Sequence, residues 1–225
     1  MEKHFHLAGV KLKNINTREA LSRVDKAFYE ERFLTLGEVN RRTLYLAGEN
    51  PSVRNLIEAL DITIIGESEI LEAAKEHGMR RQFEIDNRVF FYQFYRRMER
   101  SNRRVLLLGE TKESVMKAVA LLREEFPKLN ICKAYSLERY LGDEDGIVND
   151  INAASTDVIV SILPSPRQEY FLATHKNQLA ATIWYGMGEE KFQKPKYQWC
   201  REIVRRYRVY KLKQYIRRYE KGKEI

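Results

Sequence analysis

The segment NDINAASTDVIVSILPSPRQEYFLATHKNQ, residues 149–178, decides how we interpret the fold of this chain. Its centre is the apolar run VIVSIL at residues 158–163, preceded by the turn-prone Ser-Thr-Asp at 155–157. A short run rich in β-branched residues and bounded by turn signals is typical of a strand buried on both faces of a sheet. Pro164 ends the strand, and Pro166 suits the first turn of a following helix. The segment therefore predicts a buried strand, a stiff polar loop and a helix N-terminus.

The polar residues that open this helix are the first candidates for a binding site. They are Arg167, Gln168 and Glu169. In open α/β sheets, ligands bind beyond the carboxyl ends of the strands, and helix N-termini favour anions. We therefore predict that these three residues contact a substrate.

Comparable patterns continue along the chain in both directions. Apolar runs that predict strands lie at residues 5–12, 43–47, 61–65, 104–108, 129–134, 158–163 and 180–185. Helical patterns separate most of them, including one capped near Asn16 and one beginning near Ser52, whereas residues 80–86 are typical of a polar loop. Strands that alternate with helices imply right-handed βαβ crossovers and an α/β fold with a doubly wound, mainly parallel sheet.

The composition is that of a soluble globular protein. Hydrophobic residues make up 44% of the 225 residues and charged residues 32%, which suits one sizeable α/β domain. No apolar run approaches the roughly 20 residues that span a bilayer, and the first residues lack the apolar core of a signal peptide. The two cysteines show no disulfide or metal spacing. We therefore expect a cytoplasmic location.

The net charge of +8 is concentrated near one end of the sequence. Residues 201–225 hold ten Lys or Arg and three Glu. We therefore divide the chain into an α/β domain, residues 1–188, and a basic C-terminal helical segment, residues 189–225. Ile203, Tyr207, Tyr210, Tyr215 and Tyr219 fall near one face of that helix, opposite Arg and Lys, as in helices that lie on a membrane surface.

For this segment we expect contact with an anionic membrane. The residues predicted to touch the membrane are Arg205, Arg206, Tyr207, Arg208, Tyr210, Lys211, Lys213 and Tyr215. The alternative is a helix that packs on its own domain with a solvated basic face. Nucleic acid is a third partner class, which we rank lowest because the charge is confined to one helix.

Several familiar motifs are absent from the sequence. It has no G-x-G-x-x-G or Walker A loop, no G-x-S-x-G, and no metal-ligand spacing among its four histidines. These absences disfavour NAD binding, acyl transfer and a metal site, and we expect no cofactor. Polar residues remain near predicted strand ends: Asn50, Glu67, Gly109 with Glu110 and Thr111, and the 167–169 set, with Arg80 and Arg81 on a nearby loop. Arginine forks and carboxylates of this kind suit a sugar linked to phosphate.

The order of these segments resembles a known family. Ile151-Asn152, the Asp157 strand and Pro166-Arg167-Gln168-Glu169 resemble the I-N-x-(S/A)…D-(I/V/L)…P-K-Q-E pattern of the WecG/TagA/CpsF glycosyltransferases. The RVLLLG segment, residues 104–109, is followed at family distance by FPKL at 126–129. On this resemblance Asn50 corresponds to the asparagine of a T-x-N motif, Arg81 and Asp86 to an R-x-x-G-x-D loop, and Tyr140 to the aromatic of a G-Y-F segment.

The resemblance implies a Rossmann-like domain with a membrane-touching C-terminal appendage, often in a symmetric oligomer. It also implies inverting, metal-independent transfer from a UDP-sugar to an undecaprenyl-diphosphate-linked acceptor at the cytoplasmic membrane face, in teichoic acid or capsule synthesis. The implied substrate-binding residues are Arg80, Arg81, Asp86, Gly109, Tyr140, Arg167, Gln168 and Glu169.

The sequence also departs from the family pattern. The aspartate of the P-D-G motif, the family's proposed base, corresponds to Gly66, the threonine of T-x-N to Gly48, and the loop glycine to Glu84. The neighbouring Glu67 is our candidate base, with Asn50 beside it in the catalytic set, because an inverting transfer needs a carboxylate to take the acceptor's proton. The alternative is a non-catalytic relative that binds a partner glycosyltransferase or a nucleotide-sugar.

Overall fold

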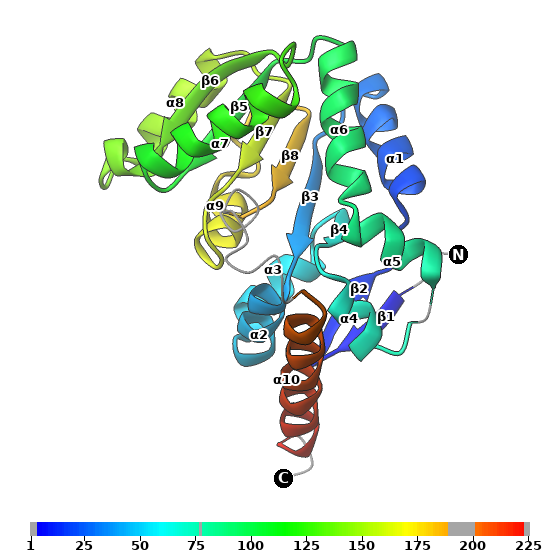
Figure 1. The fold of residues 1–225 in the computed structure, drawn as a ribbon. Coiled ribbons are helices and arrows are strands. Elements are labelled where there is room, and N and C mark those ends of the chain that lie inside the picture. Colours follow the sequence, from blue (N-terminus) through cyan, green and yellow to red (C-terminus); the bar gives the residue numbers. More distant parts are fainter. Residues whose placement is uncertain (1–3, 77, 189–200, 223–225) are drawn as a thin grey trace.

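A computed structural model describes residues 4–76, 78–188 and 201–222, with the side chains of 201–203 outside the description. A parallel sheet in the order β4-β3-β8-β7-β5-β6 forms its centre (Figure 1). The strands are β3 (Leu34–Val39), β4 (Ile62–Ile65), β5 (Val105–Gly109), β6 (Ile131–Ser136), β7 (Val158–Ser161) and β8 (Ile183–Gly186). A hairpin of β1 (His4–Leu7) and β2 (Val10–Lys13) lies outside this sheet.

Helices connect the strands and cover both faces of the sheet. The helices are α1 (Thr17–Tyr29), α2 (Arg41–Glu49), α3 (Pro51–Glu58), α4 (Ser68–Ala73), α5 (Met79–Asp86), α6 (Val89–Arg100), α7 (Lys112–Glu125), the 3-10 turn η1 (Leu137–Tyr140), α8 (Glu144–Ala153), α9 (Arg167–His175) and α10 (Arg201–Lys221). Leu36 and Tyr185 share a core with α1, α6 and α7, whereas Leu108 and Trp184 share one with α8 and α9. Alternate strand residues face opposite sides, and the predicted Rossmann-like, doubly wound α/β fold is confirmed.

Five predicted strands appear close to their expected positions. The runs at 61–65, 104–108, 129–134, 158–163 and 180–185 correspond to β4, β5, β6, β7 and β8. The predicted cap of the first helix is also confirmed, because the Asn16 side chain accepts the Glu19 N–H at 2.9 Å. Pro166 immediately precedes α9, as the N-cap residue.

The predicted strand at residues 43–47 is wrong, because these residues belong to α2. Asn40 caps that helix by accepting the Thr43 N–H at 2.9 Å, and Leu44 and Ala47 are buried on one helical face. The strand lies earlier, at β3, which the sequence pattern had missed. Asn50 therefore ends no strand. It caps α3 in place of the predicted Ser52, accepting the Ser52 N–H at 2.9 Å.

Two further predictions need correction. Residues 80–86 form helix α5 rather than a loop, because Glu84 turns inward, is buried and accepts the Thr17 N–H at 3.1 Å. The predicted strand at 5–12 is the β1–β2 hairpin, with a two-residue turn at Ala8 and Gly9. Both turn residues have positive φ, 50° and 74°, which matches the twist of a tight hairpin.

Helix α10 packs on the rest of the protein through one face (Figure 1). Val209 and Leu212 are buried, and Leu212 shares a core with α2, α4 and the hairpin. The Tyr215 hydroxyl donates to the Tyr45 carbonyl at 3.1 Å, whereas Tyr207 and Tyr210 are exposed. The tyrosines therefore divide between two faces rather than forming the single face we predicted, and the alternative of a helix packed on its own domain is correct for the inner one.

The predicted domain boundary at residue 188 adjoins residues 189–200, which lie outside the described part of the chain. Ile203, predicted on the tyrosine face, has no described side chain. Among the described helices, none is long and apolar enough to cross a membrane.

Candidate functional site

Two cavities lie beside the carboxyl end of β3, one on each face of the sheet. We call them the α3–α9 cavity and the α5–α6 cavity, after the helices that line them. They enclose about 560 and 400 Å³ of empty space, open mouths included. Glu38 lines both of them. Such a position at the carboxyl edge of a doubly wound sheet is where ligands bind in this fold class.

The α3–α9 cavity is largely apolar with polar groups at one side. Leu36, Leu60 and Trp184 contribute to its apolar wall, and Gln168 and Glu169 of α9 also line it. The Gln168 side chain accepts the Gly188 N–H at 3.3 Å. A Cβ on Gly186 would lie 2.6 Å from the Gln168 amide nitrogen, so the glycine is what lets this amide approach β8.

Glu169 carries a carboxylate that is only partly satisfied. Its Oε1 accepts the Ser165 hydroxyl at 2.7 Å, whereas its Oε2 is buried without a hydrogen-bond partner among the described residues. The side chain is buried, and burial raises the pKa of the Glu169 carboxyl above its usual value despite the hydrogen bond from Ser165. Buried polar atoms in native proteins are nearly always paired, so the unpaired oxygen marks a place for a hydrogen-bond donor from a ligand.

The other predicted residues near α9 are engaged within the protein. Arg167 pairs with Glu144 at 2.6 Å, and this glutamate also contacts the His175 ring at 3.0 Å. Asn50 reaches the Tyr170 hydroxyl at 3.4 Å, a weak contact that links α3 to α9 at the protein surface. The structure therefore places Gln168 and Glu169 in the cavity, but not Arg167 or Asn50.

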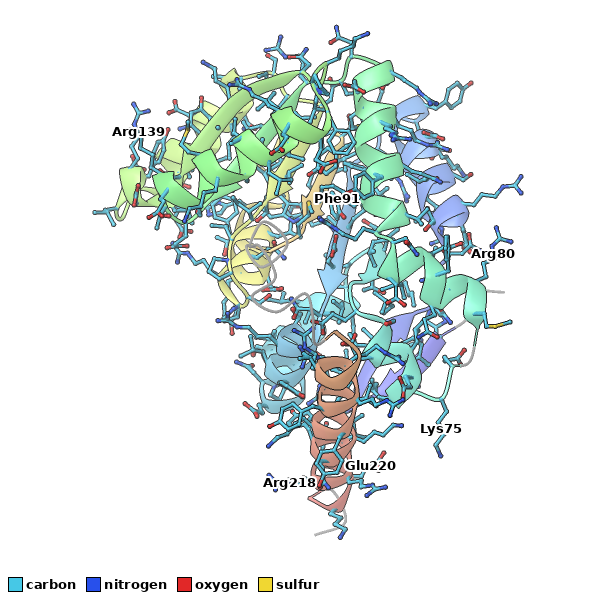
Figure 2. The ribbon with its side chains drawn as sticks, in the orientation of Figure 1. Lys75, Arg80, Phe91, Arg139, Arg218 and Glu220 are labelled. Atoms are coloured by element: carbon cyan, nitrogen blue, oxygen red, sulfur yellow. The ribbon has the colours of Figure 1, made fainter. Side chains whose placement is uncertain are left out.

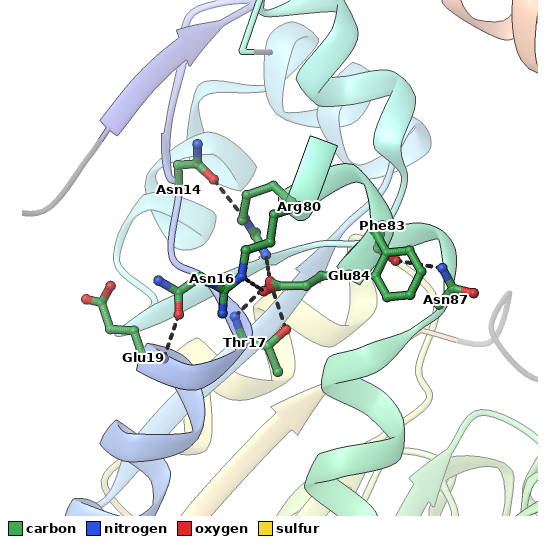
Figure 3. Close-up of polar contacts among 9 residues, drawn as sticks. Asn14, Asn16, Thr17, Glu19, Arg80, Phe83, Glu84 and Asn87 are labelled. Atoms are coloured by element: carbon green, nitrogen blue, oxygen red, sulfur yellow. Dashed lines mark hydrogen bonds and ion pairs between the residues drawn. The ribbon is translucent and has the colours of Figure 1, made fainter. Parts of the chain in front are cut away.

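The α5–α6 cavity contains the Arg81 side chain, which is already paired. Arg81 Nη1 donates to Glu84 Oε2 at 2.7 Å, and the same oxygen accepts the N–H and the hydroxyl of Thr17 (Figure 3). Burial alone would raise the pKa of Glu84, but the bonds from Thr17 and Arg81 outweigh it, so the pKa lies below its usual value. Glu84, at the position of the family's glycine, thus neutralises Arg81.

Arg80 and Asp86 lie apart from this pair. The Arg80 side chain is 84% exposed and points outward (Figure 2), and Asp86 is exposed at the end of α5. Neither lines the cavity.

Glu67, the predicted base, is bound to another residue. Its Oε2 accepts both the backbone N–H of Arg41 at 3.0 Å and the Arg41 Nε–H at 2.8 Å. Gly66 lines the α5–α6 cavity, whereas Glu67 lines neither cavity. The carboxylate therefore closes the start of α2 onto the start of α4.

The structure shows a buried polar cluster that the sequence pattern did not predict. Glu38, near the end of β3, is buried, and its Oε1 accepts the Tyr185 hydroxyl at 2.6 Å. Burial and the neighbouring glutamate raise the pKa of Tyr185 well above its usual value. The only signal was a glutamate inside LTLGEV, the run we did not assign as a strand.

Arg88 adds a cation to the wall of the α5–α6 cavity. It connects α5 to α6 in a left-handed conformation, with φ 51°, and its guanidinium lies 4.0 Å from the centre of the Phe91 ring. Its Nε and Nη2 are buried without hydrogen-bond partners among the described residues. Guanidinium groups with unused donors are suited to phosphate oxygens.

Gly109 and Tyr140 lie at the other side of the sheet, away from both cavities. A Cβ on Gly109 would lie 2.6 Å from Val115 Cγ2, so the glycine allows α7 to pack close to β5. The Tyr140 hydroxyl donates to Asp150, and burial together with this carboxylate raises the pKa of Tyr140 to about 12. A separate hollow nearby is lined by residues that include Lys112, Tyr135 and Arg139.

No cluster of three or more potential metal-ligating side chains occurs in the residues that the structure describes. The doubly wound sheet, with carboxylates and guanidinium groups in cavities at its carboxyl edge, defines a Rossmann-like ligand-binding protein. The model of the Glycosyl transferase WecG/TagA/CpsF family matches residues 5–190, and the chain belongs to this family.

Two relatives show how the match is distributed. An N-acetylglucosaminyldiphosphoundecaprenol N-acetyl-beta-D-mannosaminyltransferase of Bacillus spizizenii is 21% identical over 142 residues, which are 63% of this chain and 54% of the relative. A protein of the same name from Staphylococcus aureus is 30% identical over 89 residues, 39% of this chain and 34% of the relative. The chain thus aligns with about half of the first relative and a third of the second.

Proposed function

We propose that this protein is a glycosyltransferase of bacterial cell-surface polysaccharide synthesis, moving a sugar from a UDP-sugar to an undecaprenyl-diphosphate-linked acceptor. The observation that carries the proposal is the position of the family's P-K-Q-E segment. It brings Gln168 and the partly unsatisfied Glu169 into a cavity at the carboxyl edge of the sheet. The family match over residues 5–190 supports it.

The relatives' name suggests the substrates. It specifies transfer of an N-acetylmannosaminyl group to N-acetylglucosaminyl-diphospho-undecaprenol. We propose the same classes for this chain, an N-acetylhexosamine donor and a polyprenyl-diphosphate-linked N-acetylglucosamine acceptor. Glu169 Oε2 and the Gln168 amide would bind sugar hydroxyl or amide groups, since these supply the donors and acceptors that the cavity lacks.

The proposed chemistry needs no metal ion. The leaving UDP gains negative charge as its bond to the sugar breaks, and a guanidinium group in a water-poor site can stabilise that charge. Arg88 has donors available for this, whereas Arg81 is held by Glu84.

Attachment to the inner face of the cell membrane would bring the protein to its lipid-linked acceptor. The outer face of α10 supports this part of the proposal, because it presents the exposed Arg206, Tyr207, Arg208, Tyr210 and Lys211 to solvent. Near its end, Arg218 and Glu220 also point outward (Figure 2). Basic and tyrosine side chains together suit an anionic lipid surface.

Two residues of the predicted membrane set face the protein instead. Arg205 pairs with Glu72 at 3.0 Å, and the Tyr215 ring packs edge-on against Tyr45 with centroids 4.5 Å apart. We therefore limit the proposed lipid contact to the outer face.

Acceptor-dependent release of UDP is the expected result that tests this function. UDP would be measured from a panel of UDP-sugars with and without polyprenyl-diphosphate-linked N-acetylglucosamine, and the lipid product identified by mass spectrometry. We expect one N-acetylhexosamine donor to give release only with acceptor present. Binding of UDP without release across the panel would contradict the transferase and support the non-catalytic alternative, and no UDP binding would contradict both.

Replacing Glu169 by glutamine is expected to stabilise the protein at neutral pH while reducing its activity. The raised pKa means that the folded state binds more protons than the unfolded state between the two pKa values, so wild-type stability falls as pH rises through that window. Glu169→Gln removes this loss, with a gain on the order of 1 kcal/mol at pH 7. Denaturant unfolding at pH 4 and pH 7 measures it. Glu124→Gln, an exposed control, should leave the slope unchanged, and equal slopes for wild type and Glu169→Gln would contradict the prediction.

A further inference from the structure

An inverting transfer requires a group that takes the proton of the attacking hydroxyl. The inference below identifies that group and rests on the proposed function. Four glutamates lie in or next to the two cavities: Glu38, Glu67, Glu84 and Glu169. Their surroundings differ enough to choose among them.

Three of these carboxylates are engaged elsewhere. Arg41 holds Glu67 through backbone and side-chain donors, and Glu67 lines neither cavity. Glu84 is bonded by Arg81 and Thr17. Bonds that hold a carboxylate in its charged form lower its pKa and weaken it as a proton acceptor. Glu169 lies across the sheet from the α5–α6 cavity, beside Ser165.

Glu38 lies next to the position where the family carries its aspartate. In the pairing of β3 with β4, Glu38 is opposite Ile64 and Val39 is opposite Ile65, and the Gly66 N–H donates to the Val39 carbonyl at 2.9 Å. Glu38 and Gly66 both line the α5–α6 cavity. Glu38 also shares its strand face with Leu36, which packs in the core on the α6 side. A carboxylate on the adjacent strand can therefore enter the space that a glycine at position 66 leaves open.

The surrounding side chains orient this carboxylate and provide a site for anionic charge. The Tyr185 hydroxyl, from the neighbouring β8, donates to Glu38 Oε1 at 2.6 Å. Arg88 lines the same cavity with two buried nitrogens, Nε and Nη2, that have no hydrogen-bond partner among the described residues. A proton acceptor and an anion-binding guanidinium thus share one enclosed site.

We propose that Glu38 is the general base of the transfer, supplied from β3 in place of a carboxylate at position 66. The acceptor hydroxyl oxygen forms a bond to the anomeric carbon while its proton passes to Glu38. The bond from that carbon to the diphosphate oxygen breaks, and its electron pair leaves with UDP. Arg88 contacts the departing diphosphate, and Tyr185 is a positioning residue.

The test compares Glu38→Gln with the matched control Glu67→Gln in the full chain. Turnover is read as acceptor-dependent UDP release at saturating substrates, and equilibrium UDP binding reports an intact site. We expect Glu38→Gln to lose about 10²- to 10⁴-fold in turnover with UDP affinity within a few-fold of wild type. Glu67→Gln should keep turnover within about tenfold. Wild-type turnover in Glu38→Gln, or an equal loss in Glu67→Gln, would overturn the assignment while leaving the proposed function standing.

A second variant separates a chemical role from a structural one. Adding Gly66→Asp to Glu38→Gln returns a carboxylate to the same cavity, and we expect it to recover at least tenfold in turnover. This rescue also decides the outcome if Glu38→Gln folds poorly, because a lost packing contact would not be restored by an aspartate on β4's following residue. If Gly66→Asp raises turnover only in the presence of Glu38, the base is not Glu38. A wild-type protein without acceptor-dependent release would instead refute the proposed function.

Discussion

Leu212→Ala is expected to lower the free energy of unfolding by about 3 kcal/mol. Leu212 is fully buried on the inner face of α10, in a core shared with Leu44, Ala47 and Leu71. Removing its side chain leaves a cavity between α10, α2 and α4 that these rigid neighbours fill only in part. Denaturant unfolding monitored by circular dichroism measures the change.

The matched control is Tyr210→Ala on the outer face of the same helix. The Tyr210 side chain is 58% exposed, so we expect a change within about 0.5 kcal/mol. Equal effects of the two substitutions would contradict the packing of α10. A strong loss of lipid binding with Tyr210→Ala and none of stability would separate the two faces by function.

Replacing Arg206, Arg208, Lys211 and Lys213 together by glutamine is expected to weaken binding to anionic vesicles by roughly 1,000-fold at low salt. All four are exposed on α10. Each basic residue near an anionic surface contributes about 1 kcal/mol, and each 1.4 kcal/mol corresponds to a factor of about ten in affinity. Sedimentation with vesicles containing about 30% phosphatidylserine, compared with neutral vesicles, measures the loss.

A control variant carries the same change in net charge at another place. Arg96, Arg100, Arg123 and Lys128 are exposed on α6, on α7 and in the loop that follows α7, and their replacement by glutamine should weaken vesicle binding by less than tenfold. Equal losses in both variants would show that only net charge matters. Retained binding in the α10 variant would refute its role as the lipid-facing element.

Continuous apolar runs were enough to locate most of the central sheet. The runs at 104–108 and 158–163 became β5 and β7, because a parallel strand covered by helices on both faces must be apolar throughout. The same local reasoning placed Gln168 and Glu169 at a ligand-binding edge, since a buried strand followed by prolines and a helix has few other geometries.

Local patterns failed where distant contacts decide the conformation. TLYLA has strand-forming residues, yet it is helical because Asn40 caps it and because Leu44 and Ala47 pack on the hairpin and α10. The run LTLGEV looked too polar for a buried strand. Its Glu38 is accommodated by Tyr185, which is 147 residues away in the sequence.

The sequence by itself determined the doubly wound class, the family, the basic terminal helix and the position of the 166–169 segment, because these depend on periodicity, charge and short motifs. Tertiary structure alone decided which charged groups have partners. It paired Arg81 with Glu84 and Arg41 with Glu67, and it left two Arg88 nitrogens and one Glu169 oxygen without hydrogen-bond partners among the described residues. The physical reason is that the pairing and desolvation of a charge depend on neighbours brought together by folding.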